Sequence, residues 1–223
     1  MIDRYTLPEM GNIWTETAKL KSWLQVEIAV CEAQAELGYI PAAAVEEIKA
    51  KANFDPKRVL EIEAEVRHDM IAFLTNVNEY VGDAGRYIHL GLTSSDVLDT
   101  ALALQLVASV NILLERVEDL SQAIRYQAQQ HRNTVMVGRS HGIHAEPITF
   151  GFKLAGWLAE VFRSRARLVN LRSSIAVGKI SGAVGTYANI DPRIEAIACQ
   201  NLGLEPDCAS TQVISRDRHA EYV

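Results

Sequence analysis

Apolar residues recur at helical spacing along most of this chain, with short breaks between the segments that they define. The pattern predicts helices over residues 14–37, 41–52, 56–65, 69–81, 95–131, 148–177 and 193–202, and a further helical start at about residue 215. Gly38 and Pro41 end the first helix, and Asp55 before Pro56 is typical of a helix N-cap. The sequence therefore predicts an all-α fold.

The longest predicted helix determines the expected architecture. Residues 95–131 contain neither Gly nor Pro, and at ~1.5 Å per residue they would form a rod of roughly 55 Å. Leu106 lies on one apolar stripe of this rod and Leu104 lies on another face, so the rod needs covering on more than one side. We therefore expect an oligomeric bundle, with a small helical domain over residues 1–94 and an incomplete bundle domain over residues 95–223.

Composition and charge exclude several classes of protein. The 223 residues include 22 Lys+Arg and 28 Asp+Glu, and the resulting net charge of −6 disfavours a basic nucleic-acid-binding protein. No uninterrupted apolar run approaches the ~18 residues of a membrane span, and the N-terminus has no secretory signal. The 3 cysteines include no CxxC pair, which favours neither a disulfide framework nor a cysteine zinc site. We expect a soluble cytoplasmic protein with no nucleic-acid or membrane partner.

The segment richest in polar chemistry lies in the connector between the two longest predicted helices. It contains the run Gly138-Arg139-Ser140-His141-Gly142-Ile143-His144-Ala145-Glu146-Pro147. The glycines permit a tight backbone path, and a histidine that titrates near neutral pH can donate or accept a proton. A structural role for these histidines is equally compatible with the residues alone. A metal site made by His141, His144 and Glu146 is less favoured, because their spacing is not that of HExxH.

A second polar cluster, Arg67-His68-Asp69, lies at the junction between two predicted helices. Neighbouring side chains on a helix do not face one another, so the triplet makes no site by itself. A functional role would need partners from elsewhere in the protein. The alternative is a helix cap provided by Asp69 with solvated charges around it.

A third cluster runs from His89 to Asp96, directly before the longest predicted helix. The hydroxyls of Thr93 and Ser94, together with free backbone N–H groups at a helix N-terminus, suit a carboxylate or a phosphate. An ordinary helix cap would use the same residue types, and both roles can hold together. His89 fits either a ligand contact or a loop histidine with structural partners.

Three other segments carry polar groups without a specific signature. Arg4 suits phosphate recognition, and Tyr5 offers a stacking face and a hydroxyl. The run GKISGAVGTYAN has neither phosphate-loop spacing, so a structural or positioning loop is favoured. Gln212, in the run STQ, would offer hydrogen bonds to a ligand or form part of a polar turn.

Several of these runs occur together in one known family. RYTLPEM, the RHD triplet, HLGLTSSDVLDTA, GRSHGIHAEP, GKISGAVGTYANIDP, STQ and RDRHA resemble the motifs of the adenylosuccinate lyase family of the fumarase/aspartase superfamily, in the same order and spacing. The departure is Ser140, where that family has threonine; a hydroxyl is retained. The resemblance implies a homotetramer with a central helical bundle, active sites each assembled from three subunits, and no metal or organic cofactor.

The resemblance also implies a reaction, which is the elimination of fumarate from adenylosuccinate, giving AMP, and from the succinylated aminoimidazole carboxamide ribotide of purine synthesis. An elimination needs a base, an acid for the leaving nitrogen and groups that hold the developing negative charge. By motif, His141 is the general acid, and His68 is its helper or, alternatively, the acid itself. The residues implied to bind the nucleotide or succinyl groups are Arg4, Tyr5, Arg67, Asp69, His89, Thr93, Ser94, Ser140 and Gln212.

One part of the family's pattern is not found in the sequence. The loop of the form Ser-Ser-x-Met-Pro-x-Lys-x-Asn, which bears the serine favoured as the base, occurs nowhere in these 223 residues. We therefore expect the chain to correspond to the N-terminal half of a longer enzyme and to be inactive alone. Two alternatives stay open, namely a non-catalytic helical assembly fragment and a superfamily lyase for another succinyl substrate.

Overall fold

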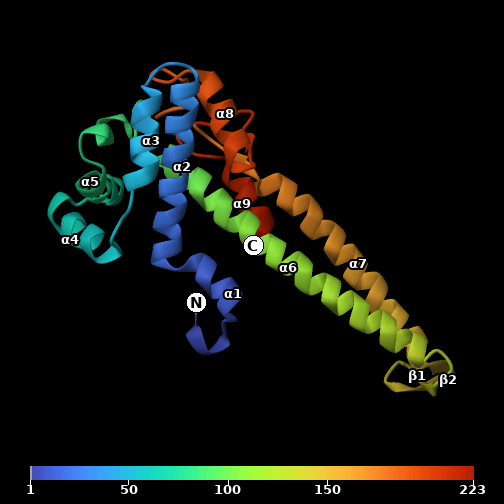
Figure 1. Cartoon of the computed structure of the whole chain (residues 1–223). Helices are drawn as coiled ribbons and strands as arrows, with labels where there is room; N and C mark the ends of the chain where they lie inside the picture. Colours follow the sequence, from blue (N-terminus) through green and yellow to red (C-terminus); the bar gives the residue numbers. More distant parts are fainter. Residues whose placement is uncertain (1) are drawn as a thin grey trace. The chain divides into compact units, whose positions relative to one another are not determined.

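The computed structural model describes residues 2–223, and helices account for 68% of the chain (Figure 1). The α-helices are α1 (Pro8–Gly11), α2 (Glu16–Glu36), α3 (Ala42–Lys51), α4 (Pro56–Val66), α5 (Asp69–Val81), α6 (Ser94–Gln130), α7 (Phe150–Ile175), α8 (Pro192–Leu202) and α9 (Arg216–Tyr222). Short 3₁₀ helices are η1 (Asp3–Tyr5), η2 (Asn12–Trp14) and η3 (Gly82–Tyr87). The predicted all-α fold class is confirmed.

Local start signals explain why several helices begin where they do. The Asp55 carboxylate accepts a hydrogen bond of 2.9 Å from the Lys57 N–H, and Pro56 occupies the first helical position of α4. Asp191 has the same role before Pro192 in α8. In both, a side-chain oxygen satisfies an N–H that the helix cannot, and proline has no N–H there to leave unpaired.

The chain forms two compact units. One contains the residues up to Ser109 together with Ser174–Val223, and the other is Val110–Ser173. Helices α6 and α7 each contribute residues to both units. These two units reflect contacts within a single chain. The predicted domain boundary near residue 94 separates a small helical domain from a bundle that several subunits would form, so it stays a prediction.

The first unit holds the main hydrophobic core, which gathers residues from α2, α3, α4, α5, the start of α6 and α8. Phe73 of α5 is fully buried, and its ring meets the Trp23 ring edge-on with centroids 5.5 Å apart. Val26, Ile48 and Ile194 are also inaccessible to solvent or nearly so. Aromatic and branched side chains of this kind bury enough apolar surface to fix the helices against one another.

Helix α6 is more apolar than the sequence analysis anticipated. It contains an 18-residue window of mean hydropathy 1.8, enough by length and composition to cross a membrane. Polar residues such as Gln105 and Ser109 interrupt the apolar run, so a search for uninterrupted runs does not find it. Half of the window is buried inside the protein, as in the core helix of a globular protein.

In the second unit, α6 and α7 lie side by side and run antiparallel. Arg172 of α7 donates to the Asn111 side chain over 2.6 Å, and Arg165 lies 3.5 Å from the Glu118 carboxylate. The later residue of α7 pairs with the earlier residue of α6, which shows that the two helices run antiparallel.

The connector between these helices is a β-hairpin, which the sequence analysis did not predict. Strands β1 (Val135–Ser140) and β2 (Ile143–Thr149) pair antiparallel, with Ser140 opposite Ile143. A bulge near Gly138 shifts the register, and a Cβ at that position would lie 2.4 Å from the Glu146 carbonyl oxygen. The strands are short and mostly exposed, so they lack the clear apolar alternation that identifies a strand in a sequence.

Candidate active site

The N-terminal pair Arg4 and Tyr5 lies in η1, and both residues are exposed. The Arg4 guanidinium carbon stands 4.8 Å from the centroid of the Tyr5 ring, a cation–π arrangement. Neither side chain hydrogen-bonds to another residue in the described part of the chain. Both polar groups are thus free to meet an anionic ligand.

The Arg67-His68-Asp69 triplet makes the turn between α4 and α5. Arg67 takes a left-handed conformation, with φ of 54°, that ends α4, and His68 is the N-cap of α5. The cap is therefore His68 rather than Asp69: its Nδ1 accepts from the Ile71 N–H at 3.4 Å. The same Nδ1 atom lies 3.4 Å from Asp69 Oδ1, and the His68 side chain is exposed.

His89 is held by a carboxylate that the sequence analysis did not single out. Its Nδ1 lies 2.5 Å from one oxygen of Glu27, and its backbone N–H donates to the other oxygen over 3.0 Å. Glu27 is buried in α2, between the core residues Trp23 and Val30. Glu27 lies among the apolar positions of α2 that face the core, and a charged residue at such a position would have indicated a buried partner. The contact orients the imidazole, whatever its further role.

Thr93 and Ser94 lie at the start of α6 and are half-buried. The Thr93 N–H donates to Asp96 Oδ2 over 2.9 Å, so a carboxylate three residues into the helix satisfies the N-cap amide. In residues 2–223 the two hydroxyls make no hydrogen bond. The Asp96 carboxylate thus caps the helix, whereas the hydroxyls of Thr93 and Ser94 can bind a ligand.

The glycine-rich run after α7 packs around a buried ion pair. Lys179 and Asp96 are both inaccessible to solvent, and the Lys179 ammonium donates to Asp96 Oδ1 and to the Gly182 carbonyl oxygen, the latter over 2.7 Å. The N–H groups of Ser181 and Gly182 donate to the same Oδ1 atom, each over 3.2 Å. These contacts support the structural or positioning role that the spacing favoured.

Gln212 lies in an exposed loop that packs on the glycine-rich run. The Ser181 and Ser210 hydroxyls are 2.8 Å apart, and a Cβ on Gly185 would lie 2.2 Å from the Ser210 carbonyl oxygen. Beyond Gln212, the Ile214 N–H donates to an oxygen of the buried Asp99 over 2.7 Å. The loop is therefore fixed on both sides of Gln212.

Burial also acts on a carboxyl group at the end of the glycine-rich run. Glu195 of α8 is buried, and burial raises its pKa, although the Tyr187 hydroxyl and the Ile180 N–H each donate to it over 2.6 Å. The same burial, aided by Glu195, raises the pKa of the Tyr187 hydroxyl. Both groups connect the run to α8, and of the two only Glu195 is fully buried.

Ser140 and His141 lie at the tip of the hairpin in the second unit. His141 and Gly142 form its two-residue turn, with φ of 53° and 75°. Positive φ at both positions is the geometry of a type I′ turn, whose twist matches that of the flanking strands. The His141 side chain is exposed and has no hydrogen-bond partner in residues 2–223. The turn therefore presents an imidazole that is free to meet a ligand.

The structure joins some of the predicted residues and leaves others apart. Asp96 connects Thr93 with the glycine-rich run, and Ser181 connects that run with the loop of Gln212. His68 shares no hydrogen bond with these segments, and His141 belongs to the other unit. The site that the resemblance implies, assembled from three subunits with His68 helping His141, stays a prediction.

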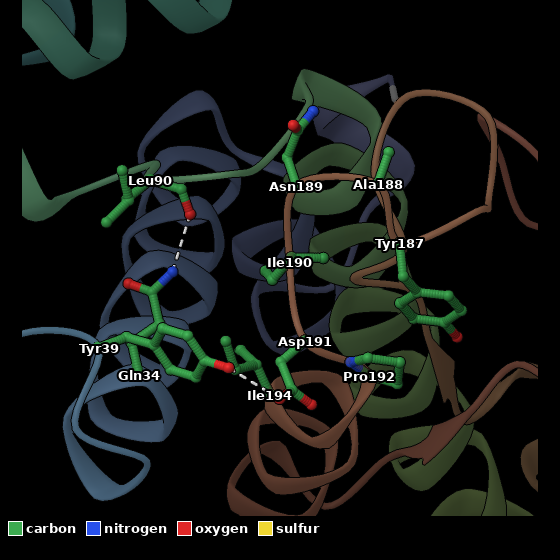
Figure 2. Close-up of a pocket in the computed structure, with 10 residues that line it drawn as sticks. All are labelled: Gln34, Tyr39, Leu90, Tyr187, Ala188, Asn189, Ile190, Asp191, Pro192 and Ile194. Atoms are coloured by element: carbon green, nitrogen blue, oxygen red, sulfur yellow. Dashed lines mark hydrogen bonds between the residues drawn. The ribbon is translucent and has the colours of Figure 1, made fainter.

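Neither a metal-binding cluster nor a cavity coincides with the predicted site residues in the described part of the chain. In residues 2–223 no group of three or more His, Cys, Asp or Glu residues is placed to hold a metal ion. The first unit has a cavity of about 380 Å³. Beside it, the Gln34 side chain donates a hydrogen bond to the Leu90 carbonyl oxygen, and the Tyr39 hydroxyl donates one to Asp191 (Figure 2). None of the predicted site residues lines this cavity.

Comparison with known proteins decides the family. A family model described as "Lyase" matches residues 3–223. This chain belongs to that lyase family. The adenylosuccinate lyases of Synechocystis sp. and Bacillus subtilis are 86% and 50% identical to it over 223 residues, and the chain spans about half, 52%, of the length of each. The resemblance inferred from the motifs is confirmed.

Solved structures of the lyase family's fold give the same picture. The 3-carboxy-cis,cis-muconate lactonizing enzyme of Pseudomonas putida superposes with a TM-score of 0.90 at 31% identity, over 100% of this chain and 53% of that one. A fumarate lyase of Mesorhizobium sp. superposes with a TM-score of 0.89 at 30% identity, over 95% and 51%. The lyase fold thus extends across the described chain, and the titles of these structures name different reactions.

Proposed function

We propose that this chain is the N-terminal half of an adenylosuccinate lyase, which acts in the cytoplasm as a homotetramer. The observation that carries the proposal is the 86% identity, over all 223 residues, to the Synechocystis enzyme of that name. The substrates are adenylosuccinate, cleaved to AMP and fumarate, and the succinylated aminoimidazole carboxamide ribotide. No metal or organic cofactor takes part.

His141 is the general acid in this proposal. A base removes the proton from the carbon beside a substrate carboxylate, the electron pair forms the double bond of fumarate, and the carbon–nitrogen bond breaks. The leaving nitrogen then takes a proton, which the imidazole of His141 donates. The exposure of His141 at a hairpin tip, with no partner in the described chain, supports this role, because a proton donor must reach the substrate.

The substrate-binding groups divide by chemistry. His68 assists near the leaving group or the phosphate, because its side chain is exposed at the start of α5, where a ligand can reach it. The hydroxyls of Thr93 and Ser94 bind an anionic group at the start of α6. The remaining ligands in the proposal are Arg4, Tyr5, Arg67, Asp69, His89, Ser140 and Gln212.

Association into a bundle would bring these residues together. Helices α6 and α7 of the second unit expose many large apolar side chains, which are Leu113, Leu120, Tyr126, Phe152, Trp157, Phe162 and Val169. Single exposed apolar residues are ordinary, but this number on two helices indicates a surface that another copy covers. A bundle of four copies would place His141 of one subunit beside His68 of another.

Two measurements test the proposal. A chain of the relatives' full length that carries these residues should convert adenylosuccinate to AMP and fumarate and elute as a tetramer on a calibrated sizing column. Succinylated substrates of other kinds serve as controls. Turnover of one of those in place of adenylosuccinate would contradict the proposal.

The polypeptide of 223 residues should show little or no turnover, because the serine-bearing loop is not among these residues. Adding the complementary C-terminal half should restore activity. A normal rate from the 223 residues alone would show that the base is assigned wrongly.

A further inference from the structure

The fully buried Asp96–Lys179 ion pair has no assigned role in the proposed reaction. Both side chains have zero solvent exposure. Taking two charges out of water is costly, and an apolar pair of similar volume is often as stable. A role that only a carboxylate fulfils would account for its presence at this position.

Asp96 makes contacts that an apolar side chain would not. Its Oδ1 accepts from the Lys179 ammonium and from the N–H groups of Ser181 and Gly182, and its Oδ2 accepts from the Thr93 N–H. Three of these donors share Oδ1 and one reaches Oδ2, and the carboxylate is closed to solvent. Because nothing outside the protein can reach it, Asp96 neither binds substrate nor acts as a base.

These contacts join segments that are far apart in the sequence. Thr93 precedes α6, and Lys179 to Gly182 follow α7. The Ser181 hydroxyl, 2.8 Å from that of Ser210, extends the network to the loop that carries Gln212. One buried carboxylate thus connects two of the segments predicted to bind substrate.

We infer that Asp96 and Lys179 are positioning residues that hold the Thr93–Ser94 and Gln212 segments in the arrangement that binds substrate. This inference rests on the proposed function. It differs from a purely structural role because it predicts a loss of substrate affinity that does not follow the loss of stability.

Asp96→Asn tests the inference with the smallest change in shape. The amide keeps one acceptor oxygen, and its NH₂ group faces either the Thr93 N–H or the Lys179 side, so one set of contacts is lost. Hydrogen exchange should become faster at the amides that face the NH₂ group, which are either that of Thr93 or those of Ser181 and Gly182. In the full-length chain the KM for adenylosuccinate should rise by about tenfold or more, with a smaller change in kcat.

The double variant Asp96→Asn/Lys179→Met separates positioning from stability. Lys179→Met alone leaves a buried unpaired carboxylate and should lower the Tm strongly. The double variant has no buried charge, so its Tm should recover while its KM stays raised. Recovery of both Tm and KM would overturn the inference.

Two further variants serve as controls. Ile48→Ala creates a cavity beside α3 and removes no hydrogen bond of Asp96 or Lys179, so it should lower Tm without changing KM. Ser181→Ala removes the contact to Ser210 and keeps the ion pair, so it remains informative if the charge variants fail to fold; its KM should also rise, and an unchanged KM would count against the inference.

Hydrogen exchange needs no substrate, so it tests the positioning role of Asp96 and Lys179 separately from the proposed lyase function. Unchanged exchange at Thr93, Ser181 and Gly182 in Asp96→Asn would overturn the inference even in an active enzyme. A wild-type chain of the relatives' full length that is folded but does not cleave adenylosuccinate would instead contradict the proposed function.

Discussion

His141 offers a test in which chemistry and backbone geometry can be separated. Its φ of 53° lies in the left-handed region, which alanine adopts at a cost of about 1 kcal/mol, whereas asparagine adopts it readily. His141→Asn therefore removes the imidazole and keeps the turn, and His141→Ala removes the imidazole and also strains the turn. Comparing the two variants isolates the contribution of the proton donor.

The expected loss follows from the role of a general acid. Both variants of the full-length chain should lower kcat by at least ~100-fold, which corresponds to about 2.7 kcal/mol in the barrier, with little change in substrate binding. The assay is steady-state turnover of adenylosuccinate, with thermal unfolding measured in parallel. His141→Ala should be the less stable of the two. A near-normal kcat in His141→Asn would refute the assignment, because that variant retains the turn.

Three other outcomes are expected. Arg4→Ala in the full-length chain should mainly raise KM, because the exposed guanidinium binds an anionic group of the substrate; an unchanged KM in steady-state kinetics would exclude that contact. Hydrogen bonds from Arg193 lower the pKa of Asp191 below its ordinary 3.8, so the stability that this helix cap provides is present above that pH and lost below it. The free energy of unfolding of Asp191→Ala should therefore differ from that of wild type most at neutral pH. Denaturant unfolding at several pH values measures it, and an equal difference at pH 2 would contradict this. In the folded chain, iodoacetamide should modify Cys208 first, since burial raises the pKa of the other two thiols to about 12; mass spectrometry of digested protein would show the order.

Local patterns in the chain were sufficient to predict the helices and most of the chemistry-bearing segments. Apolar periodicity and local stop signals placed α2 to α8 within a few residues of their observed ends, because helix formation depends on contacts three and four residues apart. Asp55 was recognised as a cap because its side chain bonds to an N–H only two residues further along the chain. The motifs around His68 and His141 also indicated the family, which the comparisons confirm.

Only the tertiary structure revealed the partners of buried charges. Glu27, which holds His89, and Lys179, which holds Asp96, are 62 and 83 residues from the groups that they contact. Sequence spacing carries no information about such pairs, because their distance is set by how the helices pack. The hairpin turn at His141 was likewise missed, since a two-residue turn with positive φ depends on the pairing of its strands more than on their composition.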